Sequence, residues 1–178
     1  MKTPRQRAWL LALNLLAFQT AWFACVLGAA RGVPLLGLAA VAAAVGLQFL
    51  LSDARMQDAA LTGLALAIGL GWDTVMMRTG IVEYASPGPF DGWAPAWILA
   101  LWALFATTLR EPLRWLQGRW WLAALFGGVG GALSYWAAIR LGAGSFPDFT
   151  LAMAVLACGW AVITPCLTEF ARYLGRGR

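Results

Sequence analysis

The amino-acid sequence predicts an all-α integral membrane protein, a bundle of about six transmembrane helices in a single domain over residues 1–178. Hydrophobic residues make up 61% of the chain and charged residues only 12%, about half of the charged fraction of a typical soluble domain. A helix needs about 20 mostly apolar residues to cross the hydrocarbon core of a bilayer. The stretches that approach this length are residues 9–30, 33–51, 57–77, 93–109, 120–143 and 149–173.

Each stretch is expected to be a helix rather than a barrel strand. Lipid offers no partners to free backbone N–H and C=O groups, so a spanning segment must satisfy them internally. The alternating pattern of a barrel strand is absent from the sequence. The first span follows a basic start and runs for about twenty residues. Because the apolar core of a signal peptide has only ~7–15 residues, we expect this span to be retained.

The connections between the spans are short, which favours antiparallel packing of consecutive helices. Residues 31–32 and 52–56 are expected to form tight turns. The segment 78–92 contains two prolines and three glycines, so it is not expected to be regular helix throughout. The segment 110–119 alternates charged residues with leucine and tryptophan, which predicts a short helix in the headgroup layer.

The basic residues predict the orientation. The side that holds both chain ends carries ten of the thirteen, namely Lys2, Arg5, Arg7, Arg55, Arg110, Arg114, Arg119, Arg172, Arg176 and Arg178. The other side carries Arg31, Arg78 and Arg140. Because basic residues near span ends stay in the cytoplasm, both termini are expected there. This asymmetry and attraction to anionic headgroups account for the net charge of +5, so membrane lipid is the expected partner and nucleic acid is not.

The residue types that are missing argue against several cofactors. The sequence contains no histidine, which argues against histidine-ligated haem, a histidine-box di-iron site and a histidine general base. The only lysine is Lys2, outside the spans, so a retinal-type Schiff base inside the bundle is excluded. Cys25, Cys158 and Cys166 form no CxxC motif and are expected to pack as small hydrophobes. We therefore predict no cofactor and no metal site.

Polar residues within the spans are the best candidates for a site, because ionisable groups in a bilayer usually face the bundle interior. At 100° per residue, one face of the third span carries Asp58, Thr62, Leu66, Gly69, Asp73 and Met76. Two interpretations of Asp73 are open. It forms an ion pair with Arg78 or Arg140 at the rim, or it lines a polar pocket with Asn14 and Tyr135. Tyr135 lies in the same outer half of the bundle as Asp73, so its hydroxyl is able to hydrogen-bond this carboxylate.

Two amides lie on nearly opposite faces of the first span. Asn14 shares its face with Cys25, and Gln19 points the other way. One of them is expected to bond across the bundle, and the other to meet a ligand or a second subunit. The predicted ligand-binding residues are Asn14, Gln19, Asp58, Thr62, Asp73 and Tyr135.

The fifth span carries a stripe of small residues. Gly127, Gly131 and Ser134 share this face, and Gly127-x-x-x-Gly131 is a small-xxx-small pattern. Such residues let a neighbouring backbone approach closely. They are predicted to serve helix packing, and a small-residue face of this kind could also pair two copies as a homodimer.

Several short motifs together resemble a family of small bacterial inner-membrane proteins that is catalogued only as a domain of unknown function. They are Asn14 with Phe18-Gln19 and Trp22, the turn from Asp53 to Asp58, Gly71-Trp72-Asp73, Pro95-x-Trp97 leading to Leu101-Trp102, and Gly127-Gly128-x-Gly130-Gly131 with Ser134-Tyr135-Trp136. The resemblance covers about residues 10 to 143. It implies the inner membrane of a Gram-negative bacterium. The resemblance also implies that the gene lies near genes for enzymes that modify unsaturated membrane fatty acids. It therefore implies a role related to membrane lipid, with a lipid-modifying enzyme as partner. It supplies no catalytic residues.

Three classes of function remain open from the sequence. The first is a membrane-embedded binding or accessory protein for a lipid-like or other apolar small molecule, which fits the lack of a catalytic motif. The second is a small transporter or exporter that uses Asp73. The third is an intramembrane enzyme built on Asp58, Asp73, Glu169 or a cysteine.

Overall fold

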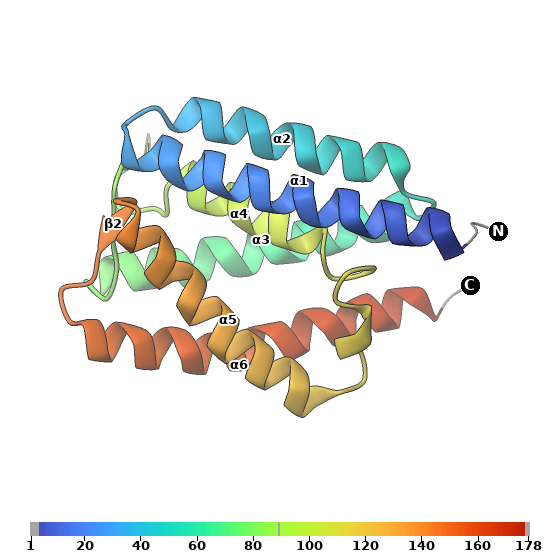
Figure 1. The fold of residues 1–178 in the computed structure, drawn as a ribbon. Coiled ribbons are helices and arrows are strands. Elements are labelled where there is room, and N and C mark those ends of the chain that lie inside the picture. The colour runs from blue at the N-terminus through green and yellow to red at the C-terminus, as the bar shows by residue number, and fades with distance from the viewer. Residues whose placement is uncertain (1–3, 89, 177–178) are drawn as a thin grey trace.

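The computed structural model describes residues 4–88 and 90–176, which form a helical bundle (Figure 1). The helices of these ranges are α1 (Pro4–Ala30), α2 (Pro34–Leu51), α3 (Arg55–Arg78), α4 (Ala96–Ala106), α5 (Trp120–Arg140) and α6 (Phe149–Gly175), with a short 3-10 turn, η1 (Arg114–Leu116). Within this described part, five helices are long and apolar enough to cross a membrane. The predicted fold class, a helical membrane bundle, is confirmed.

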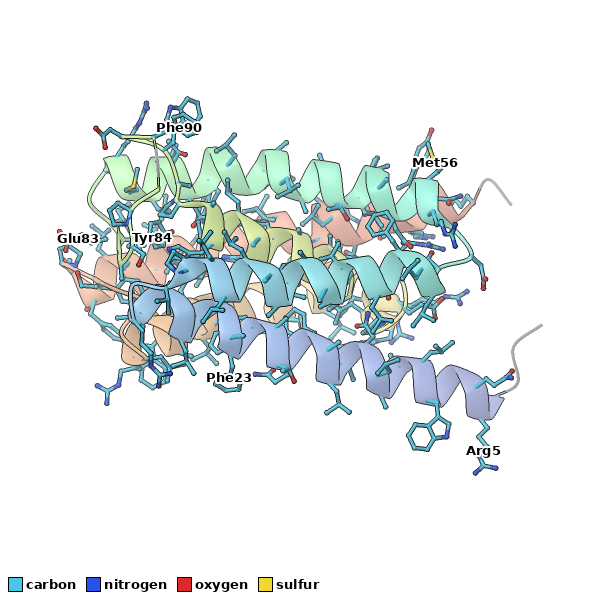
Figure 2. The ribbon with its side chains drawn as sticks, turned by 90° about the horizontal axis from the view of Figure 1, so that it is seen from above. Arg5, Phe23, Met56, Glu83, Tyr84 and Phe90 are labelled. Atoms are coloured by element: carbon cyan, nitrogen blue, oxygen red, sulfur yellow. The ribbon has the colours of Figure 1, made fainter. Side chains whose placement is uncertain are left out.

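The helices form two antiparallel pairs with α3 and α4 between them (Figure 1). α1 packs along α2, and α5 crosses α6 obliquely. The start of α1 and the end of α6 lie at the same end of the bundle. Figure 2 shows Arg5 and Met56 at this end of the bundle and Tyr84 at the opposite end. We call these the Arg5 end and the Tyr84 end. Lys2 and Arg178, used above to predict the orientation, lie outside the described residues.

The fourth span is the main departure from the prediction. It was expected to be helical over residues 93–109, but α4 has 11 residues, about 16 Å at 1.5 Å per residue. The hydroxyls of Thr107 and Thr108 donate to backbone oxygens three residues earlier, both at 2.7 Å, and turns follow. Irregular backbone at membrane depth is tolerated where protein encloses it. Thr107 and Thr108 are buried, because α4 lies in contact with α1, α2 and α3.

The segment 110–119 is not the interfacial helix that the sequence predicted. Only η1 is helical, and Leu116 is fully buried. The backbone N–H of Gly118 donates to Glu169 of α6 at 2.6 Å, and the side chain of Gln117 donates to the Leu109 oxygen at 3.0 Å. These contacts fold the segment back against α6 and the end of α4, so its leucines pack on protein rather than lipid.

The segment 78–92 contains a strand that the sequence gave no reason to expect. This strand, β1 (Glu83–Tyr84), pairs antiparallel with β2 (Gly144–Ser145), which lies between α5 and α6 in the sequence. A Cβ on Gly144 would lie 2.1 Å from the Glu83 oxygen, so only glycine permits this approach. The two-residue ladder holds Tyr84 at the end of the bundle.

Gly127 and Gly131, which the sequence assigned to helix packing together with Ser134, lie where α5 meets α6. A Cβ on Gly131 would lie 2.2 Å from Cγ of Trp160, and one on Gly127 would lie 2.2 Å from Oγ1 of Thr164. The absent side chains thus let the backbones of the two helices approach. Pairing of two copies through a small-residue face stays a prediction.

We expect the free energy of unfolding of Gly127→Ala to be about 1–3 kcal/mol lower than that of Gly130→Ala, the usual cost of overpacking. The new Cβ at position 127 would lie 2.4 Å from the backbone oxygen of Trp160, which is fixed within α6. The measurement is thermal unfolding of the purified protein in detergent.

Gly130→Ala is the matched control for this variant. A Cβ on Gly130 would meet none of the described residues within 4 Å, and both variants gain the same helix propensity, about 1 kcal/mol. Equal unfolding temperatures for the two variants would contradict a tight glycine contact between α5 and α6.

Candidate functional site

Asp73 of α3 is enclosed by three hydrogen-bond donors. Its side chain has no exposed surface. The hydroxyls of Tyr84 and Tyr135 donate to Oδ1, the latter at 2.6 Å. Nε1 of Trp102 donates to Oδ2 at 2.5 Å. We call Asp73, Tyr84, Trp102 and Tyr135 the Asp73 cluster. Its members come from α3, β1, α4 and α5, so one carboxylate joins four segments that are distant in sequence.

The chain brings these donors together through local features. Gly69 lies one turn before Asp73 on the same face of α3, and a Cβ there would lie 2.3 Å from the Trp102 ring. The missing side chain therefore lets the indole reach the carboxylate. The Trp102 ring also stacks on Trp160, with centroids 4.7 Å apart, and the Tyr84 ring packs edge-on against Trp97 at 5.7 Å.

The hydrogen bond between Tyr135 and Asp73 was anticipated from the sequence, whereas Tyr84 and Trp102 were missed. The alternative of an ion pair at the rim is not realised, since Asp73 makes none with any residue that the structure describes. Arg78 instead donates to the Gly92 oxygen at 2.7 Å, and its guanidinium lies over the Trp93 ring.

The hydroxyl of Tyr84 is held in its protonated form. Burial, together with the neighbouring Asp73 carboxylate, raises the pKa of Tyr84 well above its usual value. Loss of the proton would place a second negative charge beside the first in a poorly solvated environment. Tyr84 therefore remains a hydrogen-bond donor at physiological pH.

A groove of about 810 Å³ lies between α1 and α5 with α4 beneath it. Its walls are almost wholly apolar and include Phe18, Trp22, Leu101, Phe105, Leu133 and Trp136. Leu133 and Trp136 are also exposed at the surface, so the groove opens sideways between the two helices. This volume lies within the range of small-molecule sites, about 300–1,000 Å³.

Polar groups occur at a few points of this groove. Tyr84, Trp102 and Tyr135 line it, with Asp73 behind them. Thr164 also lines the groove, and its buried Oγ1 has no hydrogen-bond partner among the described residues. The groove thus combines a long apolar wall with the hydroxyls of the Asp73 cluster and one unsatisfied hydroxyl, and Gln19, Thr108, Ser134 and Arg140 also belong to its lining.

The other predicted site residues fall into two groups. Gln19 and Ser134 line the groove, as do Gly127 and Gly131, so these residues lie near the Asp73 cluster or along the same wall. Thr62 is half-buried on α3 and lines neither cavity described here.

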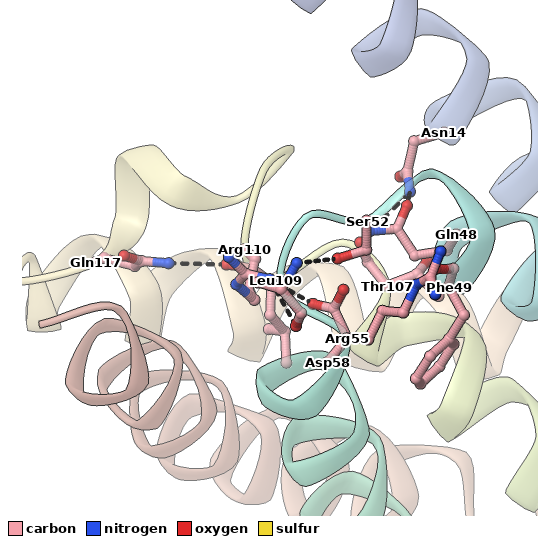
Figure 3. A network of polar contacts seen from close by, with 11 residues as sticks. Asn14, Gln48, Phe49, Ser52, Arg55, Asp58, Thr107, Leu109, Arg110 and Gln117 are labelled. Carbon is pink, nitrogen blue, oxygen red and sulfur yellow. Dashed lines mark hydrogen bonds and ion pairs between the residues drawn. The ribbon is translucent and has the colours of Figure 1, made fainter. Parts of the chain in front are cut away.

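Asn14 and Asp58 lie elsewhere, near the Arg5 end (Figure 3). The side-chain amide of Asn14 donates to Oε1 of Gln48 at 3.0 Å. Asp58 forms an ion pair with Arg110 at 2.8 Å. The predicted pocket shared by Asn14, Asp73 and Tyr135 is therefore wrong. Asn14 lies only ten residues into α1 from the Arg5 end, whereas Asp73 lies near the opposite end of α3.

The described residues contain no group of three or more cysteine, aspartate or glutamate side chains arranged to hold a metal ion. Cys25 is buried, and its thiol lies 3.3 Å from the Trp97 oxygen. Cys158 and Cys166 lie on the exposed side of α6.

Comparison with known proteins identifies a family. A family model described as "Protein of unknown function (DUF2878)" matches residues 11–166. The match spans most of the chain, and the chain belongs to this family, which confirms the resemblance noted from the sequence motifs. No curated protein and no solved structure gives a match.

Removal of one donor tests the Asp73 cluster. Tyr135→Phe is expected to lower the free energy of unfolding by about 1.5–3 kcal/mol, the usual contribution of a hydrogen bond to a charged group. The readout is the unfolding temperature in detergent. Tyr173→Phe is the control, because that side chain is 69% exposed at the end of α6. If the two variants unfold at the same temperature, the Tyr135 hydroxyl contributes nothing to the carboxylate's stabilisation.

Proposed function

We propose that this member of the DUF2878 family is a membrane-embedded binding protein for an apolar chain, such as the acyl chain of a lipid or of a lipid-like small molecule. The observation that carries the proposal is the groove of about 810 Å³ between α1 and α5. Its sideways opening would admit a ligand from the hydrocarbon layer without passage through water.

The selectivity of such a site must come from shape and from polar contacts. Lipid tails are as apolar as leucine, so transfer of a chain from bilayer to groove gains little from the hydrophobic effect. The aromatic walls supply a fixed shape. The Tyr84 and Tyr135 hydroxyls donate to Asp73, which leaves their oxygens able to accept a hydrogen bond. In this proposal a ligand hydroxyl or amide donates to one of them.

The contacts of the candidate carboxylates favour binding over transport or catalysis. Both oxygens of Asp73 already accept hydrogen bonds, so a transport role would require this cluster to open. Asp58 is paired with Arg110, and Glu169 is paired with Arg172 at 3.1 Å. Each of these groups has a structural contact that accounts for its position.

The proposal assigns the protein to the bacterial inner membrane with both termini in the cytoplasm. The ten-to-three distribution of basic residues supports this orientation. A role beside a lipid-modifying enzyme, to which the protein would present or withhold a chain, belongs to the same proposal.

A bulky side chain in the groove tests the binding role. Gly130 lines the groove, and a Cβ there would meet none of the described residues within 4 Å. Gly130→Phe should therefore fill the groove without breaking helix contacts. We expect it to weaken binding of cis-parinarol, a fluorescent fatty alcohol whose hydroxyl can donate a hydrogen bond, by at least about tenfold, or about 1.4 kcal/mol. The measurement is a fluorescence titration of the purified protein in detergent.

Gly63→Phe on α3 is the control for this substitution. Gly63 is exposed, lines neither cavity described here, and likewise leaves room for a Cβ. The affinity of the Gly63→Phe variant for the probe should equal that of the unmodified protein. Equal affinities for all three proteins would contradict binding in the groove.

The orientation is tested by thiol labelling in intact cells. The native cysteines are first replaced, and a single cysteine is then introduced at Asp91, an exposed position before α4. We expect a membrane-impermeant maleimide to label it without permeabilisation. A cysteine at Arg119, in the connection before α5, should react only after permeabilisation. The reverse pattern would invert the proposed topology.

A further inference from the structure

A second cavity of about 340 Å³ lies at the Arg5 end, between α1, α2 and the turns that follow α4. Its polar wall contains Asn14, Gln48, Ser52, Asp53, Thr107, Arg110, Glu111 and Arg114, and apolar residues, mostly leucines of α1 and α2, form the rest. Figure 3 shows the contacts of several of these residues. The cavity is thus amphipathic, in contrast to the apolar groove.

One polar atom in this wall has no hydrogen-bond partner among the described residues. The amide nitrogen of Asn14 donates to Gln48 at 3.0 Å and lies 3.4 Å from the Thr107 oxygen. Its buried Oδ1 accepts no hydrogen bond from any described residue. A buried acceptor left in this state is costly, so a turn of the Asn14 side chain toward the cavity would be favoured by a ligand that donates a hydrogen bond to this oxygen.

The charged residues provide both signs at the same cavity. Arg110 is held in place by its ion pair with Asp58 at 2.8 Å. Arg114 and Glu111 are exposed and make no ion pair with any other residue in the described ranges. Guanidinium groups bind phosphate oxygens well, and a carboxylate attracts an ammonium group.

We propose that this cavity binds the headgroup of a phospholipid with a primary amine, of the phosphatidylethanolamine class. The phosphate lies against Arg110 and Arg114, and the ammonium group donates to Asn14 Oδ1 and faces Glu111. The leucine walls favour a lipid over a soluble zwitterion, because they continue onto apolar side chains exposed along the first half of α1, such as Leu11 and Leu15. This site is separate from the groove of the proposed function.

Native mass spectrometry of the delipidated protein tests the headgroup chemistry. Phosphatidylethanolamine, phosphatidylcholine and phosphatidylglycerol with identical chains are added in separate titrations. We expect phosphatidylethanolamine to bind at least about fivefold more tightly than the others, since choline has no N–H to donate and glycerol carries no positive charge. Equal binding of the three lipids would overturn the proposal.

Three variants at exposed positions locate the binding. Arg114→Gln should weaken phosphatidylethanolamine binding about fivefold or more. Arg119→Gln, a matched change in the same connection that lines neither cavity described here, should leave it unchanged. Glu111→Gln should remove the preference for ethanolamine over glycerol, because this variant has no carboxylate to attract the ammonium group, while the preference for ethanolamine over choline persists. If Arg114→Gln behaves like Arg119→Gln, the cavity is not the binding site.

Competition with free O-phosphoethanolamine distinguishes a lipid from a soluble ligand that has the same chemistry. At a concentration equal to that of the lipid, we expect O-phosphoethanolamine to leave the bound lipid in place, because this soluble compound makes no contact with the leucine walls. Displacement at equal concentration would overturn the assignment to a lipid.

Discussion

The stabilisation of the Asp73 carboxylate is the interaction on which the rest of this bundle depends. An ionisable group at this depth of a membrane protein is expensive unless it is paired or hydrogen-bonded. Three donors from three other segments surround it. Because the carboxylate needs these three donors, α4 places Trp102 against Gly69, the short β1–β2 ladder holds Tyr84, and Tyr135 faces inward from α5. The same donors then form part of the groove wall, so the burial of one charge also shapes the candidate site.

Hydropathy and local spacing predicted the parts of this fold that depend on single segments. The long apolar helices, the glycine contact of α5 and the inward face that carries Asp73 all follow from side-chain patterns within one helix. The hydrogen bond from Tyr135 was predicted because two inward polar residues were expected at the same depth. Tyr84 and Trp102 were missed, since their positions depend on a two-residue ladder and on room left by a glycine of another helix.

The two main errors have different physical origins. α4 was expected to be longer, because its sequence stays apolar to Leu109, but Thr107 and Thr108 use their hydroxyls to tighten the helix end. Asn14 was grouped with Asp73 from its polarity alone, although the two lie toward opposite ends of the bundle. Depth along the helix axis, rather than polarity, decides which intramembrane polar groups meet.

Phe18 of α1 lines both cavities, so α1 is a shared wall between an apolar groove and an amphipathic pocket.

A density map of the protein purified from its native membrane in mild detergent tests the central claim most directly. If the groove holds an apolar chain, elongated density will lie between α1 and α5 and approach the hydroxyls of Tyr84 and Tyr135, with Asp73 enclosed behind them. A map in which α1 and α5 close directly on each other, or in which Asp73 faces a hydrated path, would contradict the account.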